Sequence, residues 1–88
     1  MFLAKIHIIL KPAVNDPQGK TIASVLMNSL GFQSVDSVRA GKYIEVRVLG
    51  DKREQVEKDI QQMCDQLLAN PVMEEYHYDI EEITSTKH

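Results

Sequence analysis

Four stretches of the chain alternate apolar with polar residues, which is the period of a β-strand with one buried face. The first stretch shows this most clearly, because Ala4, Ile6 and Ile8 alternate with Lys5 and His7. The pattern predicts four strands, at residues 2–10, 35–40, 42–49 and 72–83.

The two middle strands are separated only by Ala40-Gly41. Glycine adopts the positive φ of a tight hairpin turn without steric cost, so the sequence predicts a β-hairpin centred on residues 38–45. A two-residue loop would place Arg39 opposite Lys42, whereas a three-residue loop would place Val38 opposite Ile44. Repulsion between like charges favours the second register, and both remain open.

Apolar residues at helical spacing predict two helices. The first begins at an Asp16 cap with Pro17 in its first position and ends at Gly31. The second begins at Asp51, with Glu54 completing a capping box, and ends at Asn70-Pro71. The stripes expected to be buried are Ile22, Val25, Leu26, Ser29 and Leu30 in the first helix, and Val56, Ile60, Met63, Cys64 and Leu67 in the second.

The resulting order is βαββαβ, which predicts one domain over residues 1–83 and a C-terminal tail over 84–88. Right-handed crossovers then give a four-stranded antiparallel sheet with two helices on one face. This is the ferredoxin-like fold, of the α+β class.

The opposite face of this sheet has no cover within the chain. Such a face, with a few large apolar groups among its charges, indicates a protein interface. The open edge at residues 35–40 and the small size of the domain also favour a homo-oligomer, a dimer or tetramer. The side chains expected on the uncovered face are Lys5, His7, Ile9, Tyr43, Glu45, Arg47, Leu49, His77, Asp79 and Glu81.

Composition and charge argue against several classes of function and indicate a compartment. The chain has 88 residues and a net charge of −3, which argues against general nucleic-acid binding because phosphate contacts need a basic surface. Cys64 is the single cysteine and has no internal disulfide partner, so the cytoplasm is the expected compartment. No apolar run approaches the ~20 residues of a membrane span, so we expect no membrane association.

Candidate catalytic chemistry is sparse. His7 and His77 are expected to be neighbours on adjacent strands, but the sequence lacks the spacing typical of a metal site. Cys64 lies on the buried helix stripe and is expected to be a core residue. No serine or cysteine has a defensible base nearby, so we expect no active site and no cofactor in this chain.

The start of the first helix is a weak candidate for anion binding, because helix N-termini attract phosphate. Gly19 and Lys20 suit that role, while the charge of Asp16 opposes it and no Walker pattern is present. Gly19 also weakens the helix by about 1 kcal/mol relative to alanine. We therefore expect another segment to approach the Gly19 backbone closely.

Three segments together resemble the PurS family, the small subunit of phosphoribosylformylglycinamidine synthase. The likeness spans nearly the whole chain in order, and its combination of motifs is specific although each alone is weak. The segments are Asp16-Pro17-Gln18-Gly19-Lys20, Val38-Arg39-Ala40-Gly41-Lys42-Tyr43-Ile44-Glu45 and Cys64-Asp65-Gln66-Leu67-Leu68-Ala69-Asn70-Pro71-Val72.

This resemblance implies a supporting role in purine biosynthesis. A large subunit would carry the ATP- and Mg-dependent ligase site, and a glutaminase subunit would release ammonia. The small subunit would act as a homodimer that bridges the two and helps ammonia pass, with no catalytic residue of its own. The resemblance also implies the ferredoxin-like fold reached above.

Two other functions remain open, a regulatory ligand-binding module of the same fold and a free-standing small enzyme. For partner contact, the candidates are charged or backbone-exposing groups at turns and element ends, where recognition residues tend to lie. Charges at such positions are expected to contribute little to stability. The candidates are Asp16, Gln18, Gly19, Lys20, Arg39, Lys42, Tyr43 and Glu45.

Overall fold

The computed structural model describes residues 1–83, and the expected tail at 84–88 lies outside the described part. Each α-helix runs on into a short π-helical turn. In chain order the elements are β1 (Phe2–Leu10), α1 (Pro17–Ser24), η1 (Val25–Ser29), β2 (Gly41–Val48), α2 (Arg53–Met63), η2 (Cys64–Leu68) and β3 (Glu74–Glu82).

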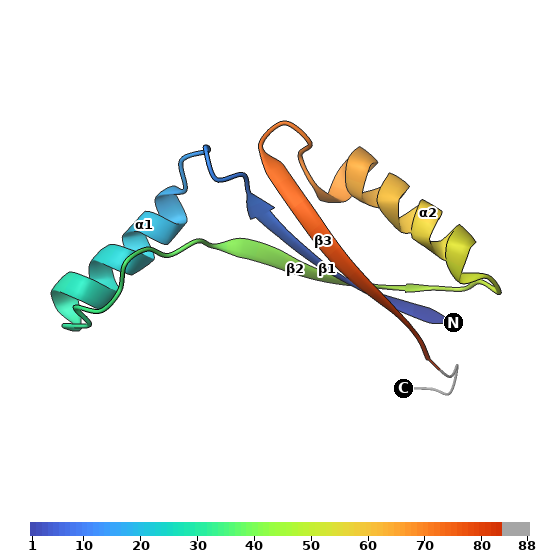
Figure 1. Cartoon of the computed structure of the whole chain (residues 1–88), viewed down its shortest axis with the longest axis horizontal. Helices are drawn as coiled ribbons and strands as arrows, with labels where there is room; N and C mark the ends of the chain where they lie inside the picture. Colours follow the sequence, from blue (N-terminus) through green and yellow to red (C-terminus); the bar gives the residue numbers. More distant parts are fainter. Residues whose placement is uncertain (84–88) are drawn as a thin grey trace.

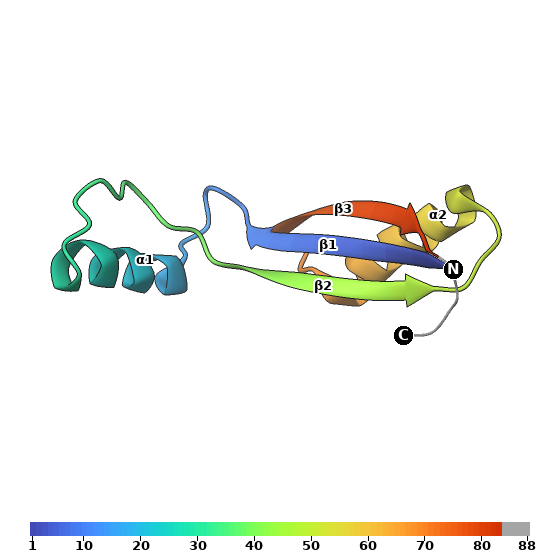
Figure 2. The same cartoon turned by 90° about the horizontal axis from the view of Figure 1, so that it is seen from below.

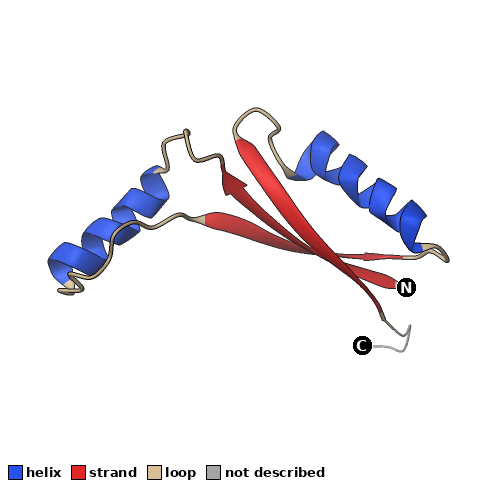
Figure 3. Cartoon of the chain, viewed as in Figure 1, coloured by secondary structure: helices blue, strands red, loops and turns tan. Residues whose placement is uncertain are grey.

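The three strands form one antiparallel sheet in the order β2-β1-β3. Ile6 in the middle of β1 lies opposite Ile44 on one side and Tyr78 on the other. The strands cross the centre of the molecule, with a helix at each end (Figures 1 and 3). The α+β class is therefore confirmed.

The core lies between this sheet and α2. Ala4, Ile6 and Ile8 of β1 are fully buried against Ile60 and Cys64. Burying one isoleucine side chain stabilises a fold by roughly 1.5–3 kcal/mol, so this contact accounts for much of the stability of the single chain. The expected burial of Cys64 is confirmed.

The predicted second strand does not form, and the described residues contain three strands instead of four. Residues 35–40 pair with no strand, so both hairpin registers are wrong. Gly41 opens β2 opposite Ile9 and has no positive φ. A Cβ on Gly41 would lie 2.5 Å from the carbonyl oxygen of Ile8, so glycine serves a close strand contact here and not a turn.

The expectation that both helices cover one sheet face is also wrong. Among the helices of residues 1–83, only α2 covers the sheet, while α1 projects beyond its far end (Figure 2). The radius of gyration is 16.9 Å, against about 12 Å for a compact chain of this length. The ferredoxin-like packing is thus not completed within one chain. We call residues 11–40 the arm.

The predicted helix ends are partly confirmed. Gly31 has a φ of +79° and ends the first helix, and Phe32 N–H returns to the Leu26 carbonyl. The second helix instead begins with Lys52 as its cap, without a side-chain bond, so the Asp51 capping box is wrong.

Candidate partner-binding site

The eight candidate contact residues fall in three separate places, and the structure does not gather them into one site. Five lie at the base of the arm, Lys42 lies at the start of β2, and two lie on the uncovered sheet face. The five at the arm base are Asp16, Gln18, Gly19, Lys20 and Arg39.

Asp16 links the beginning of the arm to its end. Its carboxylate accepts the Gly19 N–H over 2.9 Å, capping α1, and the Ala40 N–H over 2.9 Å. The residue is only 5% exposed. These two N–H groups hold the pKa of the Asp16 carboxyl below its usual value, and the charge of Arg39 acts in the same direction. Asp16 is therefore a structural tie and not an accessible contact.

Gly19 is buried against the backbone of Val38, near the end of the arm. A Cβ at this position would lie 2.3 Å from the Val38 carbonyl oxygen. The expected close approach to Gly19 is confirmed, and the approaching group belongs to the same chain. The Gly19 backbone is thereby covered and not presented to a partner.

Arg39 is tied to backbone carbonyls. Its guanidinium donates to the carbonyls of Leu10 over 2.6 Å and Lys11 over 2.9 Å, with a longer bond to Val14 at 3.5 Å. The expectation that Arg39 contributes little to stability conflicts with these bonds, because it fixes the end of β1 to the start of β2. Removing it leaves several carbonyls without a charged donor.

Gln18 and Lys20 are exposed on α1, so these two remain accessible candidates at the arm base. A groove of about 650 Å³ lies beside Lys20, between α1 and residues 36–39. The Asp16 carboxylate already takes the Gly19 N–H at the helix start. A bound anion there would meet that negative charge, which argues against the phosphate site considered from the sequence.

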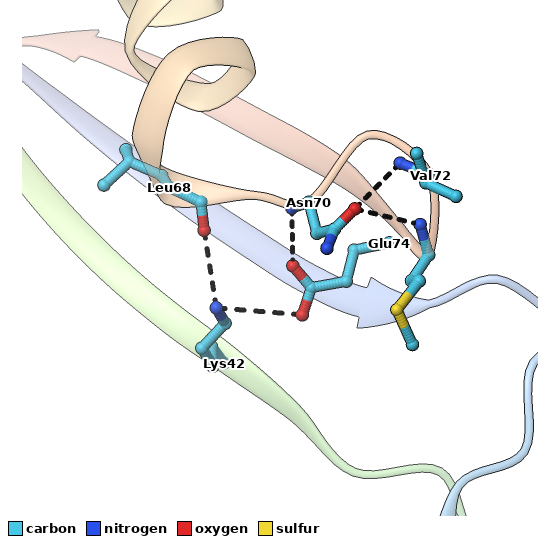
Figure 4. A network of polar contacts seen from close by, with 6 residues as sticks. Lys42, Leu68, Asn70, Val72 and Glu74 are labelled. Atoms are coloured by element: carbon cyan, nitrogen blue, oxygen red, sulfur yellow. Dashed lines mark hydrogen bonds and ion pairs between the residues drawn. The ribbon is translucent and has the colours of Figure 1, made fainter.

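Lys42 belongs to a polar network that links β2 to the connection between α2 and β3 (Figure 4). Its ammonium lies 3.4 Å from the Leu68 carbonyl and 3.7 Å from the Glu74 carboxylate. Glu74 in turn accepts the Asn70 N–H over 2.7 Å. The network crosses one end of the sheet, so Lys42 has a structural role there.

The sequence did not single out Asn70 and Glu74 for this network. The sequence pattern predicts only a helix stop at Asn70, yet its side chain accepts the N–H groups of Val72 and Met73. An asparagine before proline is typical of a turn in which the asparagine side chain accepts a backbone N–H two residues later. The Asn70-Pro71 pair could therefore have predicted this bond.

Tyr43 and Glu45 lie on the sheet face opposite α2, which we call the open face. The Tyr43 hydroxyl donates to Glu45 over 2.8 Å, and this bond raises the pKa of Tyr43. His7 lies opposite both Tyr43 and His77, confirming that the two histidines are neighbours. The open face comprises Leu3, Lys5, His7, Ile9, Tyr43, Glu45, Arg47, Glu75, His77, Asp79 and Glu81.

The described residues offer neither a metal site nor a membrane-spanning helix. Between residues 1 and 83, no three histidine, cysteine or acidic side chains come close enough to hold a metal ion. No helix in this part of the chain is both long and apolar enough to cross a bilayer.

Comparison with known proteins gives consistent matches over nearly the full length. The PurS family model, described as phosphoribosylformylglycinamidine (FGAM) synthase, matches residues 3–82. The PurS subunit of this synthase from Methanocaldococcus jannaschii is 40% identical over 94% of this chain and 99% of its own length. The Bacillus subtilis PurS subunit is 36% identical over 97% and 99%.

Solved structures agree with the sequence matches. B. subtilis PurS superposes with a TM-score of 0.82 at 36% identity, covering 93% of this chain and all of the other. A chain of the PurLQS structure from Thermotoga maritima gives 0.84 at 34% identity, covering 91% and 96%. Coverage of this extent includes most of the arm as well as the sheet. The chain therefore belongs to the PurS family, whose named members here are subunits of phosphoribosylformylglycinamidine synthase.

Proposed function

We propose that this chain bridges the large synthase subunit and the glutaminase subunit of phosphoribosylformylglycinamidine synthase and assists ammonia transfer between them. The observation that carries this proposal is the match to a chain of the PurLQS structure. ATP, Mg and glutamine would be used by the partner subunits, and this chain would supply no reacting group. The cytoplasm is the proposed compartment, because a lone cysteine fits a reducing environment.

The shape of the chain supports a bridging role. Its principal extents are 51 × 31 × 16 Å, with the arm at one end and the core at the other (Figure 1). A protein that joins two larger ones needs two separated contact surfaces. An elongated chain can present such surfaces at a distance from one another.

Reconstitution tests this role. The purified large subunit and glutaminase subunit, mixed with this chain, should form the amidine from glutamine. Omitting this chain should abolish most glutamine-dependent turnover and have much less effect when excess ammonia replaces glutamine. Equal glutamine-dependent turnover without this chain would contradict the proposal.

We also propose that two copies associate by exchanging arms. The apolar stripe that runs along α1 and η1 does not line the groove between α1 and residues 36–39, and Ile22 and Val25 are 39% and 45% exposed. On the sheet, Ile44, Val46 and Val48 of β2 face the α2 side but are only partly buried. A partner's α1 placed over β2 would cover both apolar surfaces at once.

The same exchange would supply the missing strand. β2 is an edge strand with an unpaired side, and residues 35–40 of a second copy, the segment predicted as a strand, would lie along it. The ferredoxin-like arrangement expected from the sequence would then be completed between two copies. Exchange of an identical element between two protomers is a low-cost route to a dimer.

Sedimentation of a charged arm variant tests the exchange. Val25→Glu should shift the oligomer toward monomer, because burying a carboxylate in an apolar contact is costly. Asn28→Glu, on the polar flank of the same helical segment, should leave the oligomer intact. An unchanged oligomer in Val25→Glu, with normal circular dichroism, would contradict the exchange.

A further inference from the structure

The open face has a regular arrangement of charges across its three strands. Each β1 residue on this face has one neighbour on β2 and one on β3 in the pairing register. The rows are Arg47–Leu3–Glu81, Glu45–Lys5–Asp79, Tyr43–His7–His77 and Gly41–Ile9–Glu75. The column on β3 is therefore acidic in three of its four rows.

Acidic groups outnumber cations on this face. Lys5 forms an ion pair with Glu81 at 3.0 Å, and this pair raises the pKa of Lys5. Within the described residues, Glu75 and Asp79 form no ion pair with a cation. The β3 side of the open face thus carries unneutralised negative charge at an edge of the sheet.

Apolar and aromatic groups lie beside this acidic column. Tyr43 is 49% exposed, and its ring centroid lies 4.9 Å from that of His7. Ile9 is partly exposed in the neighbouring row. An apolar and aromatic centre with a charged border is typical of a protein interface.

A second copy of this chain fits the open face poorly. Stacking two open faces would bring twice as many carboxylates as cations into one interface, and buried like charges cost several kcal/mol. The exchange of arms proposed above would cover the α2 side of the sheet and leave the open face uncovered. The charge of this face is complemented instead by a chain that presents lysine or arginine.

We propose that the open face docks a basic surface of a different protein chain, with the β3 column formed by Glu75, Asp79 and Glu81 facing its cations. This inference rests on the proposed subunit role, under which that chain is the large synthase subunit or the glutaminase subunit. The acidic column sets orientation and speeds encounter, and the Tyr43–His7 centre provides apolar contact.

Binding of the full chain to each purified partner subunit, measured at low and at high salt, tests this inference. The double variant Glu75→Lys with Asp79→Lys should bind one subunit at least about tenfold more weakly at low salt. The difference should shrink at high salt because screening shortens the reach of exposed charges. Arg47→Glu makes the face more acidic and should not weaken that binding.

A matched control places the same charge change on the other side of the sheet. Glu54→Lys with Asp59→Lys alters only α2 and should bind as the unmodified chain does. Circular dichroism of both double variants checks that the fold is retained.

The outcomes separate the two hypotheses. If the unmodified chain binds a subunit and the open-face variant binds equally well, the inference is overturned and the bridging role stands. If the open-face variant instead changes the self-association of the chain, the face contacts a second copy and the inference is overturned. If the unmodified chain binds neither subunit, both proposals fail.

Discussion

The arm and the sheet with α2 each contain a helix with an apolar stripe, but different interactions hold the two regions together. In the sheet, fully buried side chains such as Ile6 and Ile60 provide the cohesion. In the arm, the ties are polar and backbone contacts made by Asp16, Gly19 and Arg39, and the apolar stripe remains exposed. A helix with an apolar stripe therefore need not lie on its own chain's sheet, and the stripe of the arm is left exposed in the single chain.

Truncation of a core side chain should produce the largest loss of stability. It tests whether buried apolar contacts hold the sheet and α2 together. Ile60→Ala should lower the free energy of unfolding by about 2–5 kcal/mol, because it opens a cavity in a fully buried site. Chemical denaturation measures this loss, which should be much the same at low and high protein concentration.

Val25→Ala is the matched truncation on the arm. At low protein concentration, where single chains dominate, it should change stability by no more than about 0.5 kcal/mol. Under the proposed exchange, its effect should grow as concentration rises, since mass action then buries the residue. A loss like that of Ile60→Ala at every concentration would show that the arm has its own core.

Gly19→Ala tests the internal packing of the arm. The added methyl would meet the Val38 carbonyl, and the resulting overpacking should cost roughly 1–3 kcal/mol, exceeding the gain of about 1 kcal/mol in helix propensity. Hydrogen exchange should show lost protection in α1 and unchanged protection in β1. Loosening of both regions together would contradict the separation into two parts.

The arm should also loosen in acid before the sheet does. Because the pKa of Asp16 is lowered in the folded chain, its contribution to stability is present above the ordinary pKa of aspartate. This contribution is lost as pH falls through the lowered value. Asp16→Asn should remove that pH dependence from hydrogen exchange in α1, while an equal pH dependence in the variant would assign it to other carboxylates.

The smallest expected effect is on thiol reactivity. Burial raises the pKa of the Cys64 thiol and keeps reagents away, so labelling of the native chain should be slow. Labelling should accelerate in denaturant, in step with the unfolding of the sheet. Rapid labelling of the native chain would mean that α2 opens as readily as the arm.

Local features of the sequence determined much of this structure. Alternation predicted β1 and the sharing of the open face by Lys5, His7 and Tyr43, because strand periodicity is a property of neighbouring residues. Helical spacing predicted α2 and the burial of Cys64. Gly31 ended the first helix as expected, because positive φ is a local requirement that glycine meets.

Tertiary contacts decided what local patterns could not. The sequence predicts Gly41 in a hairpin turn, but in the structure it lies in a strand, close to the carbonyl oxygen of Ile8. The sequence predicts Asp16 as a helix cap and Arg39 as an exposed charge, and only the fold shows their bonds to distant backbone groups. Periodicity identifies the face of α1 that seeks burial, but the surface that covers it depends on residues distant in sequence or on another chain.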